Sequence, residues 1–419
     1  MHEWLAWLET LHPRVIDLGL ERVRSVAQRL GLQQPGFCII TVAGTNGKGS
    51  SVAMLEAILH AAGYRVGSYS SPHLIDYNER IRIQTEPLAD AELCAAFARV
   101  EAARDDTSLT YFEFGTLAAL DLFRAHRREI VVLEVGLGGR LDAVNVWDAD
   151  VALISAIGID HTEWLGPDRE SIGREKAGVL RAGRPAVCSD PAPPASVAQV
   201  ATALGAHLYQ SGRDFSFEPG ADSWTWRHGG RVRSALPHPA MRGDYQLYNA
   251  AGVLMALEAV GSRFPVTQAQ VRAGLLTAVL PGRFQTLPGR PLRVLDVAHN
   301  LQAVESLAAN LRRQPVTGRT LAVCGMLRDK PVSDVMRVMG PEVHAWHLAS
   351  LTTARGASAQ ELHAALVSAG VTAPATLHAD VASAYDAAMA AAGPEDRVVV
   401  FGSFYTVGGI LRRLRLERI

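Results

Sequence analysis

Continuous apolar runs alternate with amphipathic stretches along most of the chain. Strands are predicted at four apolar runs, residues 39–42, 65–70, 130–135 and 151–157. Helices are predicted from 3.6-residue periodicity at residues 52–62, 93–103, 112–126, 168–180, 244–260 and 267–278. Runs without a polar face are typical of parallel strands covered on both sides. Strands that alternate with helices indicate right-handed crossovers, so we expect an α/β fold with a doubly wound, mostly parallel sheet.

The alternation is interrupted twice. Residues 206–237 place aromatic and polar residues in alternation around Gly229-Gly230, which predicts a small antiparallel patch with a hairpin turn. Turn-forming residues then cluster at 281–291, and the strand–helix pattern resumes with strands near residues 292–297, 320–324, 345–348 and 397–401. A chain of 419 residues is too long to fold around a single hydrophobic core. We therefore expect a larger domain at 1–285 and a second, smaller α/β domain at 286–419.

A glycine-rich stretch with one lysine follows the first strand. Its residues are Gly44, Thr45, Asn46, Gly47, Lys48, Gly49 and Ser50. Such a turn into a helix directs backbone N–H groups and the positive end of the helix dipole at an anion, and Lys48 would meet phosphate as a mobile cation. The spacing departs from the Walker A pattern, because Val42 replaces the first glycine and Gly49 follows the lysine. An ordinary glycine-rich turn is therefore the alternative.

Polar residues stand where the predicted strands end. Ser71 follows the second strand, Glu134 lies near the end of the third, and His161 lies just past the fourth. Parallel neighbours would bring all three to one edge of the sheet, where ligands collect in such folds. A hydroxyl and a carboxylate beside phosphates suit a divalent cation, although histidine is an unusual Mg²⁺ ligand. Taken singly, each residue also has an ordinary structural explanation.

Other candidates are weaker by themselves. Arg140 follows the glycines after Glu134 and could supply charge to a ligand, and Lys176 lies on a charged helix where a solvated lysine is the commoner outcome. Asp296 and His299 end a strand before a helix, where capping is an equal explanation. Arg283 precedes the expected second domain and could equally be an exposed linker arginine.

Composition restricts the class of partner. Hydrophobic residues make up 48% of the chain and its net charge is -1, so no overall field recruits nucleic acid or an anionic membrane. The cysteines are scattered without a Cys-x-x-Cys pair, which favours a reducing compartment. No apolar run is long enough to cross a bilayer, and the N-terminus does not have the pattern of a signal peptide. We expect a cytoplasmic monomer with small-molecule substrates.

Several motifs, in order along nearly the whole chain, resemble the folylpolyglutamate synthase family, whose wider relatives are the Mur ligases. They are Ala43 to Ser50, Tyr69 to Leu74, Leu133 to Asn145, Ile159 to Gly166, Arg174 to Gly178, Pro281 to Phe284 and Asp296 to Asn300. The resemblance implies a Mur ligase-like P-loop domain followed by a Rossmann-like domain. It also implies an ATP-dependent ligase that activates a folate carboxylate as an acyl phosphate, couples it to L-glutamate and releases ADP and phosphate.

The resemblance assigns roles residue by residue. The loop Gly44 to Ser50 would hold the ATP phosphates, and Asn249, Arg283, Asp296 and His299 would complete the nucleotide site. Mg²⁺, at two expected sites, would be bound by Ser71, Glu134 and His161. Lys48, His161 and Lys176 are the candidate catalytic residues, and Lys176 corresponds to the lysine that is carbamylated in this family. Arg140 and Asn145 would contact substrate.

Within the family the resemblance is to bifunctional bacterial members, which act on both dihydropteroate and tetrahydrofolate. It rests on residues 16–23 and 109–115, and it makes Asp17, Leu18, Gly19 and Phe112 candidates for a pterin pocket. A ring stacked on Phe112 and a carboxylate on the pterin nitrogens are physically reasonable, but Phe112 could equally belong to the core. Two alternatives remain open: a Mur-type ligase acting on a nucleotide sugar, and a P-loop switch that hydrolyses ATP to change shape.

Overall fold

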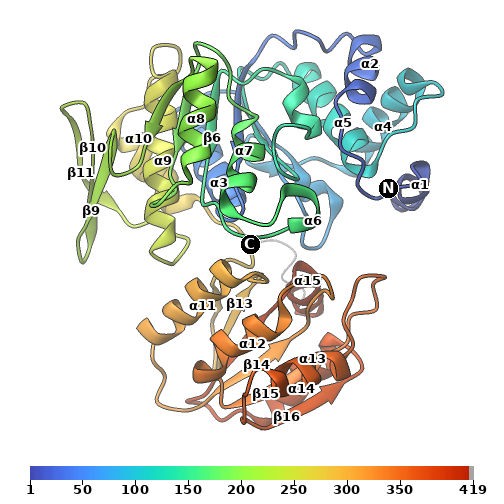
Figure 1. Cartoon of the computed structure of the whole chain (residues 1–419), viewed down its shortest axis with the longest axis vertical. Coiled ribbons are helices and arrows are strands. Elements are labelled where there is room, and N and C mark those ends of the chain that lie inside the picture. Colours follow the sequence, from blue (N-terminus) through green and yellow to red (C-terminus); the bar gives the residue numbers. More distant parts are fainter. Residues whose placement is uncertain (415–419) are drawn as a thin grey trace. The chain divides into compact units, whose positions relative to one another are not determined.

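The structure of the chain, a computed structural model, describes residues 1–414 and divides them into two compact units (Figure 1). Unit 1 holds residues 1–73, 77–240 and 245–279. Unit 2 holds the short segments 74–76 and 241–244 and residues 280–414. Each unit is built on a mostly parallel sheet with helices, so the predicted fold class is confirmed.

Unit 1 is organised around an eight-stranded sheet with the order β4-β3-β2-β5-β1-β6-β7-β8. Its strands are β1 (Cys38–Ala43), β2 (Val66–Tyr69), β3 (Ile81–Ile83), β4 (Glu86–Pro87), β5 (Ile130–Glu134), β6 (Val151–Ile154), β7 (Pro185–Cys188) and β8 (His207–Gln210). The strands from β2 through β8 in this order pair in parallel, and β3 and β4 add an antiparallel edge. The carboxyl ends of β2, β5, β1 and β6 therefore lie side by side.

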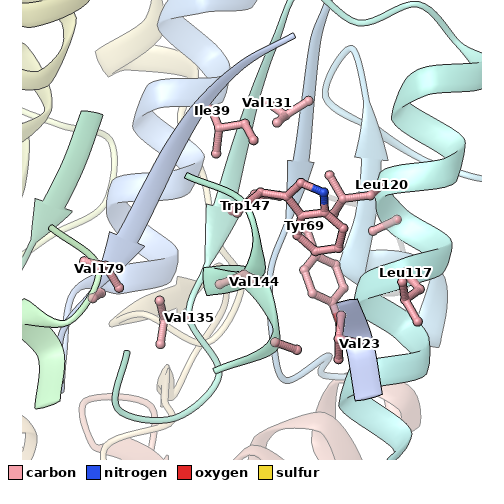
Figure 2. Packing of buried hydrophobic residues seen from close by; sticks show 14 of the residues in the cluster. Val23, Ile39, Tyr69, Leu117, Leu120, Val131, Val135, Val144, Trp147 and Val179 are labelled. Carbon is pink, nitrogen blue, oxygen red and sulfur yellow. The ribbon is translucent and has the colours of Figure 1, made fainter. Parts of the chain in front are cut away.

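Ten helices of the described chain belong to unit 1. They are α1 (His2–Leu11), α2 (Glu21–Arg29), α3 (Lys48–Ala61), α4 (Asp90–Arg104), α5 (Tyr111–Ala125), α6 (Thr162–Leu165), α7 (Arg169–Ala177), α8 (Ala195–Leu204), α9 (Tyr245–Val260) and α10 (Gln268–Thr277). The core between α5 and the sheet joins Leu117 and Leu120 with Ile39 and Val131, and Trp147 and Tyr69 fill the space beside them (Figure 2). This dry layer fixes the strands whose ends carry the candidate residues.

The predicted antiparallel patch is confirmed as a three-stranded sheet of β9 (Phe215–Pro219), β10 (Ser223–His228) and β11 (Arg231–Pro237). Gly229 and Gly230, both at positive φ, form the turn between β10 and β11. Residues 207–210, which we expected in this patch, instead form β8 of the main sheet. The sequence did not separate them because both segments are short and partly exposed.

Unit 2 contains a six-stranded sheet with the order β12-β13-β17-β14-β15-β16. Its strands are β12 (Gln285–Leu287), β13 (Leu292–Asp296), β14 (Thr320–Cys324), β15 (Ala345–Ala349), β16 (Ala375–His378) and β17 (Arg397–Phe401). Its helices are α11 (Leu301–Arg313), α12 (Val332–Met339), α13 (Ala359–Ser368), α14 (Val381–Ala391) and α15 (Phe404–Arg413). The predicted strands are confirmed, while β12 and the exposed edge strand β16 were not predicted.

Candidate active site

The glycine-rich loop joins β1 to α3 at the centre of the unit 1 sheet. Lys48 is the first residue of α3, and its Nζ lies 3.1 Å from the carbonyl oxygen of Gly44 and 3.2 Å from that of Thr45. The hydroxyl of Thr45 donates to the carbonyl of Gly158, and the hydroxyl of Ser155 donates to the carbonyl of Asn46. These bonds hold the loop against the end of β6. The loop leads into the N-terminus of α3, whose positive dipole end favours an anion.

A buried chain of amides lies behind the loop. Asn249 donates to Gln246 at 3.0 Å, and Gln246 donates to the hydroxyl of Ser50 at 3.3 Å. All three side chains are almost fully buried. Asn249 and Gln246 come from α9, so this helix positions the start of α3 through hydrogen bonds as well as packing.

Two of the predicted metal ligands meet at the same edge of the sheet. Glu134 ends β5 and is buried, and its carboxylate accepts a hydrogen bond from the backbone N–H of Ser71 at 3.2 Å. His161 lies in the loop after β6 in the left-handed conformation, at φ 52°, and its backbone N–H donates to Asp160. A carboxylate and a hydroxyl are the oxygen donors that Mg²⁺ prefers.

The protein alone does not complete a metal cage. Within residues 1–414, no three His, Cys, Asp or Glu side chains are grouped in a way that could hold a metal ion. A divalent ion at Glu134 and Ser71 would therefore need phosphate and water oxygens as further ligands, which is the usual situation of Mg²⁺ in sites that bind nucleotides.

Buried charges surround the loop lysine. Lys176, on α7, is only 3% exposed, and burial lowers its pKa to about 7; the nearby Lys48 lowers it further, while Asp160 and Asp142 act in the opposite direction. Burial likewise raises the pKa of Asp142 to about 7, although the backbone N–H groups of Leu137 and Val144 donate to it. Near neutral pH, therefore, Lys176 is partly an uncharged amine.

The candidate pterin residues are held in a network of ion pairs. Asp17 accepts from Arg22 at 2.7 Å and lies 3.2 Å from a ring nitrogen of His12. Arg22 also pairs with Glu113 at 2.9 Å. Glu113 and Thr110 form the capping box at the start of α5. Leu18 and Gly19 are half-buried in the same loop. The Asp17 loop is thus fixed to the first turn of α5, the helix that carries Phe112.

Phe112 lies over the loop that follows Glu134. Its ring would contact a Cβ on Gly136 at 2.8 Å, and its ring centre lies 5.7 Å from that of Tyr69. Phe112 is half-buried, so part of the ring remains available to a ligand. Its position beside the Glu134 strand end agrees with a role in binding as well as in packing.

Arg140 and Asn145 are linked to each other and to α7. Arg140 is half-exposed and pairs with Glu175 at 3.0 Å. Asn145 donates to the carbonyls of Arg140 and Gly178, and its side-chain oxygen accepts from Arg181. Both the nitrogen and the oxygen of the Asn145 side chain are hydrogen-bonded to protein groups, so Asn145 fixes the backbone at Arg140.

The candidates of unit 2 gather at the start of α15 and the end of β13. Asp296 accepts from the backbone N–H groups of Phe284 and Ala298, both at 2.8 Å, and burial raises its pKa to about 6 although Arg283 opposes the shift. The guanidinium of Arg283 lies 5.1 Å from the ring centre of Phe404. The ring of His299 lies 6.2 Å from that of Phe404.

Sequence reasoning missed three residues of these groups. Asp142, Asp160 and Phe404 were not singled out, because a buried carboxylate and a supporting ring look ordinary in a sequence. For Lys48 and Lys176 the composition held a further signal, because the chain has only three lysines among 41 Lys and Arg residues. Lysine differs from arginine in offering a compact ammonium and an amine that can become neutral.

Fold and site together define an ATP-dependent ligase of the Mur ligase type. A family model described as "Mur ligase, glutamate ligase domain" matches residues 282–404. The dihydrofolate synthase/folylpolyglutamate synthase of Escherichia coli K12 is 46% identical over 99% of this chain and 96% of that protein. Solved E. coli FolC in complex with DHPP and ADP has a TM-score of 0.94 and 46% identity, covering 100% of this chain and 98% of that one.

A second solved structure adds ligands. It is a bifunctional folylpolyglutamate synthase/dihydrofolate synthase with Mn, AMPPNP and L-glutamate bound, with a TM-score of 0.91 and 48% identity over 99% of this chain and 98% of that one. This chain belongs to the dihydrofolate synthase/folylpolyglutamate synthase family. The predicted family and activity, ATP-dependent ligation of glutamate to folate substrates, are confirmed, as are the use of ATP and of a divalent metal. In the described chain no helix is both long and apolar enough to span a bilayer.

Proposed function

We propose that this chain joins L-glutamate to both dihydropteroate and tetrahydrofolate, and that the candidate residues share the work as follows. The observation that carries the assignment is that the Lys48 loop and the Glu134–Ser71 pair lie at neighbouring carboxyl ends of one sheet, and that the buried Lys176 of α7 lies close enough to Lys48 for their charges to interact. ATP phosphorylates the substrate carboxylate, the glutamate amine attacks the resulting acyl phosphate, and phosphate leaves as the amide forms. Positioning and charge stabilisation supply most of the catalysis in such transfers.

Gly44 to Ser50 would cradle the phosphates of ATP, with Lys48 moving from its carbonyl partners to the γ-phosphate. Ser71, Glu134 and His161 would hold divalent metal at two sites. Bound metal neutralises charge on the phosphates; the protein contributes oxygen ligands and a rigid sheet edge to fix them. Asn249 supports the loop, and Arg283, Asp296 and His299 would contact the nucleotide.

Lys176 would be carbamylated. Its amine is partly uncharged near neutrality, as an amine must be to attack carbon dioxide: its nitrogen bonds to the carbon and loses a proton, which gives a carbamate anion. The new carboxylate would add an oxygen ligand for the second metal and would replace a positive charge beside Lys48 with a negative one. Both changes fit a site that gathers cations around phosphate.

The pterin would lie against Phe112 with Asp17, Leu18 and Gly19 at its polar edge, and Arg140 would meet a substrate carboxylate while Asn145 holds the Arg140 backbone. The rigid network of Asp17, Arg22 and Glu113 supports this arrangement, since it fixes the loop to the helix of Phe112. The monomeric state and the cytoplasmic location stay predictions.

The experiment is ADP release and product mass with ATP, Mg²⁺ and glutamate, with dihydropteroate in one reaction and tetrahydrofolate in another. We expect a glutamate-sized mass gain on both substrates and none in Lys48→Ala, whose circular dichroism should match the wild type. A mass gain on tetrahydrofolate alone would contradict the proposed activity on dihydropteroate and the proposed role of the Asp17 loop. Normal turnover in Lys48→Ala would overturn the phosphate-loop assignment.

A further inference from the structure

One fully buried amide on α9 has no assigned part in the function proposed above. Gln246 is 0% exposed, and apart from Asn249 the other buried residues of this helix are apolar. An amide that is removed from water costs free energy unless its donor and its acceptor are both hydrogen-bonded. An apolar residue would fill the same place without that requirement. The partners of Gln246 therefore indicate what its amide does.

Gln246 connects the phosphate loop to a residue of the expected nucleotide site. Its side-chain nitrogen donates to the hydroxyl of Ser50 at 3.3 Å, and its side-chain oxygen accepts from the side-chain nitrogen of Asn249 at 3.0 Å. Ser50 lies in the first turn of α3, and both partners are buried, so water does not compete for these bonds. Each end of the Gln246 amide thus has one protein partner.

The bond to Gln246 fixes which way round the Asn249 amide lies. Because the nitrogen of Asn249 donates to Gln246, its oxygen lies on the side of the phosphate loop. A Cβ on Gly47 would stand 2.4 Å from that oxygen and 3.1 Å from the nitrogen. Rotating the amide by 180° would place a donor where the acceptor now is. The rotated amide would also set its oxygen against the oxygen of Gln246, so the present orientation is favoured.

We propose that Gln246 is a positioning residue for ATP. It holds the Asn249 amide with its oxygen toward the phosphate loop, so that the nucleotide meets a hydrogen-bond acceptor there. Ser50 anchors Gln246 and thereby couples the orientation of Asn249 to the first turn of α3. Gln246 is fully buried and acts through Asn249. This inference rests on the proposed role of Asn249 in the nucleotide site and adds the residue that orients it.

The test replaces Gln246 with methionine, which has a similar size and no amide. The control is Leu247→Met, which brings the same side chain to the next buried position of α9, where no side-chain hydrogen bond is lost. Isothermal titration with AMPPNP and Mg²⁺ measures nucleotide affinity without turnover. We expect Gln246→Met to weaken AMPPNP binding about fivefold, the net effect of one lost hydrogen bond. Leu247→Met should bind AMPPNP as the wild type does, because Leu and Met exchange with little disturbance of packing.

Steady-state kinetics separates positioning from general damage to the fold. In Gln246→Met the KM for ATP should rise about fivefold, while kcat at saturating ATP and the KM for glutamate stay close to those of the wild type, because only nucleotide binding is weakened. A damaged fold would instead lower the active fraction, and with it kcat. Thermal melts and circular dichroism of both methionine variants show whether they are folded. A fall in kcat without a change in the KM for ATP would contradict the positioning role.

A double variant shows whether the effect passes through Asn249. Once Asn249→Ala has removed the amide, nothing is left to orient, so adding Gln246→Met should cause no further loss of AMPPNP affinity. Fully additive losses would show that Gln246 acts independently of Asn249 and would overturn the inference. So would wild-type affinity in Gln246→Met when Asn249→Ala binds more weakly, and that result would leave the role of Asn249 intact. Wild-type affinity in Asn249→Ala would contradict the proposed role of Asn249 and this inference together.

Discussion

Gly47 lies directly against Asn249: a Cβ on Gly47 would stand 2.4 Å from the side-chain oxygen of Asn249. Asn249 cannot easily withdraw, because it is buried and bonded to Gln246. Gly47 also has φ 87°, in the left-handed region. The close approach of loop and α9 therefore requires glycine at this position, and the loop geometry that would hold phosphate depends on it.

We expect Gly47→Ala to lose ligase turnover by on the order of 10²-fold, because a displacement of the loop by about 1 Å is enough for such a loss. The matched control is Gly63→Ala at the end of α3, which has φ 84° and no atom within 4 Å of the added Cβ. Both changes carry a backbone cost of roughly 1–2 kcal/mol, but only Gly47→Ala also meets Asn249. Steady-state kinetics and thermal melts of the two variants check this, and equal turnover in both would contradict it.

Lys176→Arg should reduce turnover by on the order of 10²-fold with little change in the KM for ATP. Arginine keeps the positive charge but can neither become neutral nor form a carbamate. In Lys176→Ala, formate or acetate should restore part of the activity by supplying the missing carboxylate. Lys48→Ala provides the control, because the same acids should not restore it. Rescue of both variants, or of neither, would contradict the proposal that Lys176 acts as a carbamate.

Phe404→Leu should raise the KM for ATP about threefold, the equivalent of the 0.5–1 kcal/mol typical of a cation–π pair. The reason is the guanidinium of Arg283, which lies 5.1 Å from the ring centre and would lose its support. The neighbouring Tyr405, which is exposed, provides the control Tyr405→Leu. Combined with Arg283→Ala, the effect of Phe404→Leu should disappear, since the two residues act as one unit. Fully additive effects on the KM would show that Phe404 acts independently of Arg283.

The strands that carry the site could be predicted because they are buried on both faces. The runs 130–135 and 151–157 are almost entirely apolar, which predicts parallel strands that are covered on both faces. Parallel pairing places the ends of neighbouring strands together, so the proximity of Ser71 and Glu134 could be predicted as well. The edge strands β12 and β16 were missed for the opposite reason: they are short and half-exposed, and only pairing with a neighbour defines them.

The electrostatics of the site could not be read from the chain in the same way. Asp142 lies inside a motif that was recognised, yet its burial and its two backbone donors depend on the fold of the loop after Glu134. Lys176 was a candidate by resemblance alone, because its surroundings are formed by segments far apart in the sequence. Periodicity reports which face is buried; it does not report which charges are buried together.

Glu56 provides a test of buried charge in unit 1, away from the loop. It lies on α3 at 2% exposure, accepts from Ser68 at 2.9 Å and lies 3.5 Å from Arg82. Burial raises the pKa of Glu56 above its ordinary 4.5, although Arg82 and Ser68 oppose the shift. The folded chain therefore holds this proton more tightly than the unfolded chain does. The stability from Glu56 is complete below pH 4.5 and falls as the pH rises toward the folded-state value.

Glu56→Gln removes this titration, so the variant should gain stability relative to the wild type as the pH increases above 4.5. Urea unfolding followed by tryptophan fluorescence at several pH values measures the difference, and six of the seven tryptophans belong to unit 1. The control is Glu9→Gln on α1, the same substitution at an exposed side chain. A stability difference between Glu56→Gln and wild type that stays constant or shrinks with rising pH would mean that Arg82 and Ser68 outweigh burial.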